Sequence, residues 1–361
     1  MKIAILNDTH FGYKNGSSHY MNYQSLFYRN VFFPYCKEHG ITEILHLGDM
    51  FDNRRQISIK TLRFVREQFL EKLAENNMHM HVIPGNHDTF FRNTNDLCSL
   101  VEVLKHYSDC VTLHMEPTII DYDGVDVGLV PWINNTNYSD SLHFIANSTC
   151  PILAGHFEVA GFKYIANSNI KSQGENLSVF SQYDLVLSGH YHTRGTHQNV
   201  MYLGSQYEFN WSDVDDGKFF HVLDTVSRDV HAVQNTNYLY YRFYYNDTDA
   251  ESIEDILANA DISNITDTFV RVVVQKKNNY HIFDQFINQI QQKNPFDLSV
   301  IENFDVGSSI EAEENIEAIE DTSTLIDDYV DNTLSTPLDK DKLKTMLQHL
   351  YAEASMLETV I

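Results

Sequence analysis

The sequence lacks long apolar runs: nowhere in its 361 residues do about 18 apolar residues follow one another, so it predicts no membrane-spanning helix. The apolar run at its start, MKIAIL, is too short for a secretory signal peptide. Cysteine is scarce and forms no C-x-x-C pair, which argues against a thiolate metal site and a disulfide framework. We expect a cytoplasmic protein without membrane contact, whose cysteines are reduced thiols: Cys36, Cys98, Cys110 and Cys150.

Positive charge is also scarce. The sequence has 25 Lys and Arg against 50 Asp and Glu, which gives a net charge of −25. Residues 231–361 hold only 8 of the basic residues but 24 of the acidic ones, and residues 298–330 include no Lys or Arg. Nucleic-acid affinity depends on cationic neutralisation of phosphates. Any nucleic-acid substrate must therefore be held by local basic groups, a bound metal or a partner chain.

Residues 1–230 combine strand-like and helix-like segments. Helices are predicted within 22–39 and 58–76, and the second has an apolar face at helical spacing, formed by Ile59, Leu62, Val65, Phe69 and Leu73. Short apolar runs predict strands at 2–6, 43–47, 80–83, 125–130, 151–155, 183–188, 199–203 and 218–223. The early elements alternate and the later ones are mostly strand. This mixture predicts an α/β (α+β) fold with two stacked sheets covered by helices.

The pattern changes after residue 230. An aromatic strand at 238–245, a strand at 268–275 and two helix-like segments predict a small α+β domain over residues 231–296. An acidic linker is predicted over 297–334, because it contains the run EAEENIEAIED. Residues 335–361 predict a helix with one apolar stripe, which either packs on its own chain or docks on a partner.

Five predicted strands end in polar turns, whose sequences are NDTH, GDMFD, GNHD, GHFE and GHYH. Four of the five contain a glycine, which lets the backbone turn sharply so that the next side chain points into a common pocket. We expect the ends of these strands to converge and to bring together Asp8, His10, Asp49, Asp52, Asn86, His87, His156, His190 and His192.

These residue types indicate a metal centre. Carboxylate oxygens, an amide oxygen and imidazole nitrogens suit Mn, Fe or Zn. Seven ligands are too many for one tetrahedral ion, but they fit two ions that lie about 3.5 to 4 Å apart and share a bridging carboxylate. A single GNHD or GH is more often an ordinary turn, whereas the ordered set of five favours a metal site.

The order D-x-H, G-D-x-x-D, G-N-H-D, G-H, G-H-x-H resembles the calcineurin-like metallophosphoesterases across residues 1–230. The resemblance implies a four-layer αββα sandwich with a dinuclear metal centre at the strand ends. It implies that one ion is held by Asp8, His10, Asp49 and His192. The other would be held by Asp49, Asn86, His156 and His190. His87 would then assist departure of the leaving oxygen while a hydroxide between the ions attacks phosphorus.

Four further residues are candidates for supporting roles. Arg54 and Arg55 are the best local anion-binding residues, although a solvated pair at a helix start is the ordinary alternative. Asp52 either touches substrate or braces its turn. Asp88 either orients a neighbouring imidazole or bonds nearby backbone N–H groups.

The segment MYLGSQYEFNWSD, after the last histidines, resembles the Y-x-G-S segment of SbcD-type nucleases, which process broken DNA ends together with an ABC-type ATPase. The likeness is greatest to the nuclease subunits of T-even-type phage recombination endonucleases. It implies a DNA exonuclease and endonuclease that uses two Mn²⁺ ions, or Mg²⁺ or Fe²⁺, in DNA replication, recombination and repair. A phage protein of this kind would act in the cytoplasm of its bacterial host.

The same resemblance implies partners. Residues 231–296 would be a capping domain, and residues 335–361 would dock on a coiled-coil ATPase of the SbcC type. SbcD-type relatives form homodimers, and residues 90–110 are either such a contact or a buried helix. The alternatives are a phosphoprotein phosphatase or cyclic-nucleotide phosphodiesterase, and a non-catalytic metal-bound scaffold for the ATPase.

Overall fold

The computed structural model describes residues 1–163, 174–302, 330, 340, 342–347 and 350. Contacts divide the chain into one unit of Met1–Phe209 with Asp213–Phe304 and a second of Asn210–Ser212 with Asp305–Ile361. Residues 342–347 of the second unit are helical. Most of the predicted linker, 297–334, and most of the predicted terminal helix, 335–361, lie outside the described residues. Within the described ranges, no helix is long and apolar enough to cross a bilayer.

The described strands of the first unit form two six-stranded sheets and one three-stranded sheet. The first sheet has the order β12-β11-β1-β2-β3-β4, with strands Val230–Gln234, Phe219–Asp224, Lys2–Leu6, Glu43–His46, His79–Val82 and Val111–Leu113. The second has the order β5-β6-β7-β8-β10-β9, with strands Thr118–Tyr122, Val125–Val130, Ile152–Gly155, Leu185–Ser188, Val200–Tyr202 and Gly195–His197.

Parallel pairing brings the ends of the site-bearing strands to common edges. In the first sheet β1, β2, β3 and β4 pair in parallel, with Leu6 opposite His46 and His46 opposite Val82. In the second sheet β6, β7, β8 and β10 are parallel, with Gly155 opposite Ser188. The turns after β1, β2 and β3 therefore start at one level, as do those after β7 and β8.

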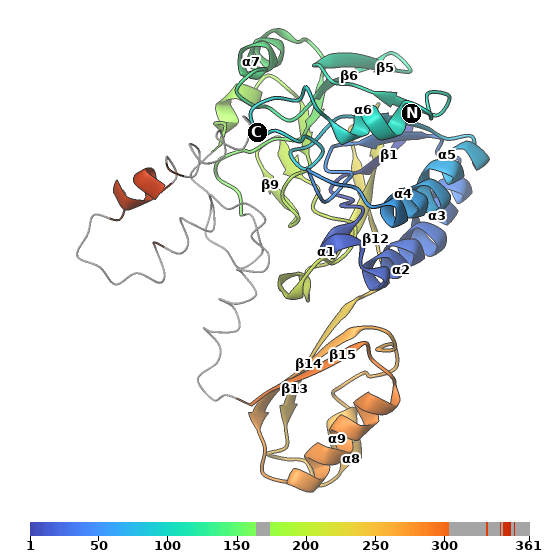
Figure 1. Cartoon of the computed structure of the whole chain (residues 1–361), viewed down its shortest axis with the longest axis vertical. Helices are drawn as coiled ribbons and strands as arrows, with labels where there is room; N and C mark the ends of the chain where they lie inside the picture. The colour runs from blue at the N-terminus through green and yellow to red at the C-terminus, as the bar shows by residue number, and fades with distance from the viewer. Residues whose placement is uncertain (164–173, 303–329, 331–339, 341, 348–349, 351–361) are drawn as a thin grey trace. The chain divides into compact units, whose positions relative to one another are not determined.

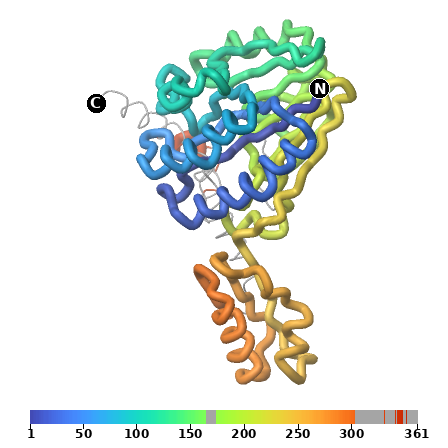
Figure 2. Tube along the Cα trace, turned by 90° about the vertical axis from the view of Figure 1, so that its right-hand side faces the viewer, coloured from blue at the N-terminus to red at the C-terminus, as the bar shows by residue number. Residues whose placement is uncertain are grey.

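The main core lies between the two sheets. It joins buried residues of β1 and β2, such as Ile5 and Leu45, to residues of β6, β7 and β8, such as Leu129, Ile152 and Leu187. Because alternate residues of a strand face opposite sides, these positions form the inner faces of both sheets. The outer faces are covered by helices, so the four-layer αββα sandwich predicted from the sequence is confirmed (Figures 1 and 2).

Helices cover the two outer faces differently. The first sheet is covered by α2 (Ser18–Phe27), α3 (Phe33–Glu38), α4 (Ile59–Val65) and α5 (Glu71–Glu75), joined by π-helical turns η1 (Tyr28–Phe32) and η2 (Arg66–Leu70) (Figure 1). The second sheet packs its outer residue Leu153 against Ile145 of α7 (Tyr138–Asn147) and Phe180 of η3 (Leu177–Phe180). The short elements α1 (Tyr13–Gly16) and α6 (Ser99–Leu104) lie in loops after β1 and β3.

One helix face differs from its prediction. Val65, Phe69 and Leu73 are fully buried, as their spacing predicts, but Ile59 is 85% exposed. Ile59 is the first residue of α4, directly after the N-cap Ser58, whose side chain accepts a hydrogen bond from the Thr61 N–H. The spacing rule therefore fails at Ile59, the first residue of the helix.

The three-stranded sheet is parallel and has the order β13-β14-β15, with strands Tyr240–Asn246, Phe269–Lys276 and Asp297–Ile301. Helices α8 (Ile253–Leu257) and α9 (Tyr280–Gln292) pack their apolar residues against it. Two segments differ from the expected boundaries of this region. Residues 297–301, expected in the linker, form β15, and residues 231–234, expected in the small domain, belong to β12 of the first large sheet.

Candidate metal centre

The five polar turns follow β1, β2, β3, β7 and β8, and the structure brings their side chains together. The predicted ligand atoms of Asp8, His10 and His192 lie within 4.8 Å of one another. So do those of Asp49, His156 and His190. A ring nitrogen of His10, one of His87 and a carboxylate oxygen of Asp52 lie equally close together. Two sheets thus supply one cluster of carboxylates and imidazoles, and this convergence is what the turn sequences predict.

The first group joins β1 to the turn after β8. Asp8 Oδ1 lies 4.0 Å from His10 Nε2 and 3.9 Å from His192 Nε2, and the two imidazole nitrogens are 3.1 Å apart. The side chains of Asp8 and His10 are fully buried, and that of His192 is 12% exposed. Ligands about 2.0 to 2.2 Å from a shared ion lie at separations of this size, so these residues fit one cation.

The second group is centred on Asn86. Its side-chain oxygen lies 2.9 Å from His156 Nε2 and 3.1 Å from His190 Nδ1, and Asp49 Oδ2 lies 3.3 Å from His156 Nε2. The Nδ1–H of His156 donates to the Leu47 carbonyl at 2.7 Å, which directs Nε2 toward the group. Oxygen and nitrogen lone pairs therefore converge on one point, an arrangement that a divalent cation satisfies.

Asp49 lies between the two groups. Its Oδ2 is 3.3 Å from His156 Nε2 and 3.9 Å from His10 Nε2. Burial alone would raise the pKa of Asp49, but the charges of His156 and His87 hold it well below its ordinary value. Burial would lower the pKa of His156, whereas Asp49 raises it to about 9. Each of the two groups therefore stabilises the charged form of the other.

The backbone of these turns is unusual. Asp8, His10, Asp49 and His190 have φ angles of 46°, 40°, 53° and 82°, in a left-handed region that residues other than glycine seldom adopt. Gly85 allows the turns after β2 and β3 to touch: a Cβ at this position would lie 2.2 Å from Asp49 Oδ1 and 2.4 Å from Asp49 N. Strained backbone held by close packing is a feature of functional sites.

The chain matches the family model described as calcineurin-like phosphoesterase over residues 1–194, more than half of its length. It belongs to the calcineurin-like phosphoesterases. The chain is also 28% identical over 358 residues to exonuclease subunit 1 of enterobacteria phage T4, a match that covers 98% of this chain and 100% of that protein. This phosphoesterase is therefore a metal-dependent hydrolase of phosphoesters.

Similarity to solved structures is looser. An archaeal phosphodiesterase matches 65% of this chain and 100% of its own at 14% identity, with a TM-score of 0.34. A protein of unknown function from Aquifex aeolicus matches 43% of this chain and 77% of its own at 17% identity, with a TM-score of 0.27. Neither likeness adds to the family assignment.

In this phosphoesterase, His87 lies beside the ligand cluster and is held at two points. Its backbone N–H donates to Asp49 Oδ1 at 2.7 Å, and its ring Nδ1–H donates to the Asp52 carbonyl at 2.7 Å. The ring meets that of His10 edge to face at a centroid distance of 4.9 Å. Since the carbonyl can only accept, Nε2 is the nitrogen that could exchange a proton with a substrate.

The surroundings of Asp52 and Asp88 differ. The carboxylate of Asp52 is 3.6 Å from His10 Nδ1, which suits a group that orients this imidazole. Asp88 is fully buried and accepts N–H bonds from Met50 at 3.2 Å, Phe51 at 3.0 Å and Gly85 at 2.9 Å. Burial and the nearby Asp49 raise the pKa of Asp88 to about 6. These contacts favour the alternative in which Asp88 is a turn carboxylate that joins two site turns.

The two candidate anion-binding arginines are not equivalent. An Nη of Arg54 lies 3.0 Å from the side-chain amide of Asn86, so this half-buried side chain reaches the metal centre. The Arg55 side chain is exposed, and its backbone N–H donates to Asn53 Oδ1 at 2.9 Å. The structure thus places Arg54, but not Arg55, against a predicted ligand.

Sequence reasoning missed several residues that surround the centre. Asn7 donates to Asp8 Oδ2 at 2.6 Å, and Gln206 donates to the Asp8 carbonyl at 3.1 Å. The Trp132 ring lies 5.3 Å from that of His190, and the Phe209 ring lies 4.9 Å from that of His192. Trp132 lies two residues after the predicted strand 125–130, and this place just past a strand end is a signal in the sequence.

Proposed function

We propose that this phosphoesterase is a Mn²⁺-dependent DNA nuclease with exonuclease and endonuclease activity. The observation that carries the proposal is the double cluster of ligands that shares Asp49, with His87 at its edge. Two divalent ions held there would activate a water and neutralise charge on a phosphoryl group. The seven proposed ligands are Asp8, His10, Asp49, Asn86, His156, His190 and His192.

The chain's own residues would do the remaining work. His87, oriented by the Asp52 carbonyl, would donate a proton from Nε2 to the departing oxygen. The Asp52 carboxylate would keep the His10 ring turned toward its ion. Arg54 would bind a non-bridging phosphate oxygen, because its guanidinium lies 3.0 Å from the Asn86 amide.

DNA as the substrate is supported by the relative rather than by the site geometry. That relative is named as an exonuclease subunit, and the match extends over almost the whole of both chains. A subunit implies a partner, and we propose an ABC-type ATPase of the SbcC type, docked through residues 335–361. We also propose action in the host cytoplasm during DNA end processing, recombination and repair.

A second copy of the chain is the other proposed partner. Within the predicted contact region 90–110, Phe90, Leu97 and Val101 are 38%, 44% and 40% exposed. They lie around α6 and the loop that precedes it. Exposed apolar residues close together are typical of an interface between protein chains.

The test compares the wild-type chain with Asp49→Ala on linear double-stranded and single-stranded DNA, at low salt, in Mn²⁺, in Mg²⁺ and in chelator. DNA cleavage that needs Mn²⁺ and disappears in the variant is the expected result. Turnover of a phosphopeptide or a cyclic nucleotide without DNA cleavage would contradict the nuclease proposal. No hydrolysis of any substrate, even with the ATPase added, would instead indicate a non-catalytic scaffold.

A further inference from the structure

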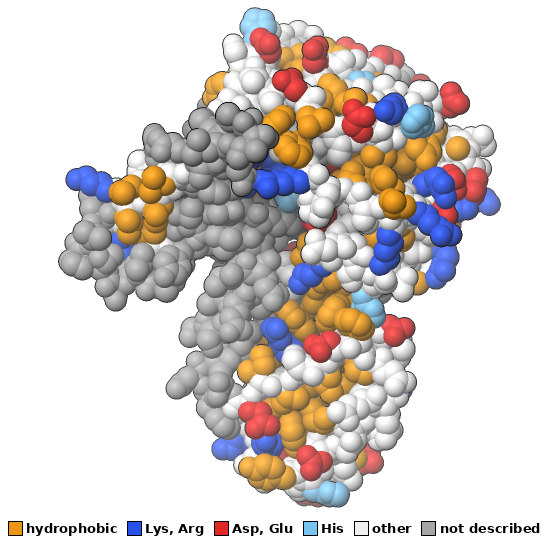
Figure 3. Space-filling view, viewed as in Figure 1, with side chains coloured by type: hydrophobic (Ala, Val, Ile, Leu, Met, Phe, Trp, Pro, Cys, Tyr) orange, Lys and Arg blue, Asp and Glu red, His pale blue; other side chains and the backbone are white. Residues whose placement is uncertain are grey.

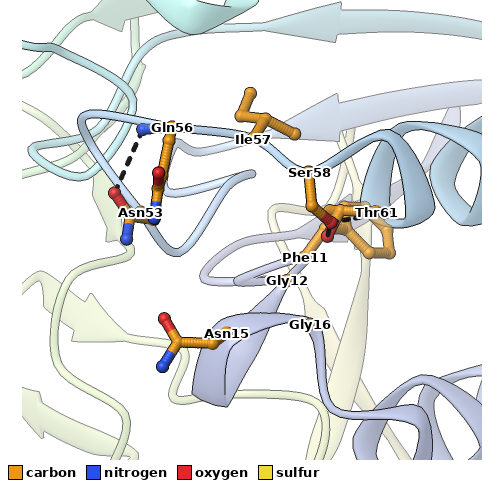
Figure 4. A pocket seen from close by; sticks show the side chains of 9 residues that line it. All are labelled: Phe11, Gly12, Asn15, Gly16, Asn53, Gln56, Ile57, Ser58 and Thr61. Atoms are coloured by element: carbon orange, nitrogen blue, oxygen red, sulfur yellow. Dashed lines mark hydrogen bonds between the residues drawn. The ribbon is translucent and has the colours of Figure 1, made fainter.

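A hollow of about 190 Å³ lies beside the metal centre, between the loop after β1 and the loop after β2 (Figure 4). It is far larger than a single ion or water requires. None of its lining residues carries a charge: Phe11, Gly12, Asn15, Gly16, Asn53, Gln56, Ile57, Ser58 and Thr61.

Close packing fixes the wall where the two loops meet. Gly12 and Gly16 have φ angles of 94° and 72°, and a Cβ on either would lie 3.0 to 3.2 Å from the Thr61 side chain. Glycine is therefore the residue that can adopt these positive φ angles and also lie this close to the Thr61 side chain. The Ser58 and Thr61 hydroxyls bond each other at 2.9 Å, so this wall presents few polar groups to a ligand.

The opposite rim carries amide side chains. Asn53 Oδ1 accepts backbone N–H bonds from Arg55 and Gln56, at 2.9 and 3.2 Å, which directs its NH₂ group toward the opening. Asn15 faces it across the hollow in Figure 4. The side-chain amides of Asn15 and Gln56 form no hydrogen bond with any residue that the structure describes.

This chemistry selects a class of ligand. Neutral amides offer both donors and acceptors, as the edge of a nucleobase does, and Asn and Gln are standard partners of base edges. A phosphate or a metal ion would need charged or anionic groups, which the lining lacks. The apolar lining residue Phe11 is only 1% exposed, because its ring packs against Tyr28 and Phe69, so the amides are the groups that a ligand would meet.

The two segments that contribute the lining of the hollow are rich in basic residues. Residues 9–37 and 53–66, which include both loops, contain eight Lys and Arg and no Asp or Glu. The chain as a whole has a net charge of −25, so these segments are a local exception. Figure 3 shows Lys and Arg side chains gathered over the helices that follow these loops. Such a surface attracts a phosphate backbone.

The hollow is next to the reacting position. Phe11 directly follows His10, and Asn53 directly follows Asp52, while Asp52 Oδ1 and His10 Nδ1 are 3.6 Å apart. We propose that the hollow binds an unpaired nucleobase of the strand whose phosphodiester lies at the metal centre. This inference rests on the proposed nuclease function and assigns a single-stranded nucleotide as the unit that the site recognises.

The test removes the two amides that form no hydrogen bond among the described residues. Asn15→Gly keeps the positive φ of 58° without strain, and Gln56→Ala shortens an exposed side chain. Binding of a short single-stranded oligonucleotide and of an abasic strand of the same length is measured by fluorescence anisotropy in chelator, which prevents hydrolysis. The double variant should bind the intact strand about tenfold more weakly. Its affinity for the abasic strand should be unchanged.

The matched control is Gln291→Ala with Gln292→Ala, which removes two exposed amides from α9 and should alter neither affinity. An equal loss on intact and abasic strands, or no loss on either, would overturn the nucleobase site. Hydrolysis of bis(p-nitrophenyl) phosphate, which has no base, should proceed at the wild-type rate in the double variant. If the wild-type chain hydrolyses neither this ester nor DNA, the proposed nuclease function is wrong. The affinities for the intact and the abasic strand would still show whether the hollow binds a nucleobase.

Discussion

Two buried polar clusters meet at His192, and they neutralise their charges in different ways. The His192 ring belongs to the metal centre, where carboxylates, an amide and imidazoles face one another. The His192 carbonyl belongs to the second cluster, in which Lys218 Nζ donates to it at 3.2 Å, to Asp213 at 2.5 Å and to Asp216 at 2.9 Å. The second cluster contains its own cation, Lys218. The metal centre is instead a set of ligands for a cation that comes from outside the chain.

This difference has a consequence for stability. Burial alone would lower the pKa of Lys218, but Asp213 and Asp216 raise it, so the lysine stays charged and the cluster is complete once the chain folds. The metal centre places four of its residues in strained backbone and gathers ligands that need an external cation. Its stability should therefore depend on the metal concentration, while that of the Lys218 cluster should not.

The largest expected effect is that of removing the ion. Chelation should abolish hydrolysis and lower the melting temperature, because an ion at about 1,000 times its dissociation constant adds about 4 kcal/mol to the free energy of unfolding. Thermal unfolding in Mn²⁺ and in chelator measures this difference. Asp49→Ala removes the shared carboxylate and should abolish both the activity and the response to Mn²⁺. A variant that kept the full Mn²⁺ response would contradict the bridging position of Asp49.

A smaller effect is expected from His87→Ala, because this residue is proposed to move a proton and not to hold an ion. The kcat for DNA should fall about 100- to 10,000-fold, while the rise in melting temperature on adding Mn²⁺ stays unchanged. The loss should be smaller with bis(p-nitrophenyl) phosphate, whose leaving group departs without a proton. Wild-type DNA cleavage by this variant would exclude His87 as the proton donor.

The sequence predicts the metal centre better than its surroundings, and the reason is physical. Each ligand follows a strand that can be recognised from its apolar run, and parallel pairing then brings the strand ends together without further information. Phe209 and Gln206 reach the centre from a segment far along the chain. Their segment, MYLGSQYEFNWSD, resembles one in SbcD-type nucleases, but its local pattern does not show which of its side chains contact the centre.

The secondary structure also includes elements that the local sequence pattern does not predict. The six-residue strand β6 has the bounds that its sequence VDVGLV predicts, because four of its residues are valine or leucine. The strand β15 has the sequence DLSVI, in which polar residues interrupt the apolar ones, and it was assigned to the linker. Its pairing with β14 is a tertiary contact that single-sequence periodicity does not report.

Lys218→Met tests the cluster that carries its own cation. The change leaves Asp213 buried without its charge partner and should lower the free energy of unfolding by about 3–5 kcal/mol, in Mn²⁺ and in chelator alike. Lys105→Met is the matched control, because Lys105 and Glu102 form an exposed ion pair at 3.1 Å that should contribute less than about 1 kcal/mol. Equal effects of the two changes, measured by denaturant unfolding, would show that the Lys218 cluster adds no more than a surface pair.

The smallest expected effect concerns Glu208, next to this cluster, whose buried carboxyl group is balanced by neither an ion nor a lysine in direct contact. Its Oε2 accepts backbone N–H bonds from Leu239 at 2.6 Å and Tyr240 at 3.0 Å, at the start of β13. Burial raises the pKa of Glu208 from its ordinary value near 4.5 to about 8, although these N–H groups lower it. The folded chain therefore binds this proton more tightly than the unfolded chain does, and the stability it provides should fall as the pH rises from about 4.5 to about 8.

Glu208→Gln keeps an oxygen that can accept the same N–H bonds but stays neutral, so it should remove this pH dependence. The melting temperature of the wild-type chain should fall relative to that of the variant between about pH 5 and about pH 8, with each 1 kcal/mol corresponding to about 2–4 °C. Glu116→Gln, at an exposed position, should leave the wild-type profile unchanged. A constant difference between wild type and Glu208→Gln across this range would mean that the carboxylate is already ionised at the lower pH. Glu208 would then resemble Asp49, whose pKa is held low by neighbouring histidines, and not a neutral acid.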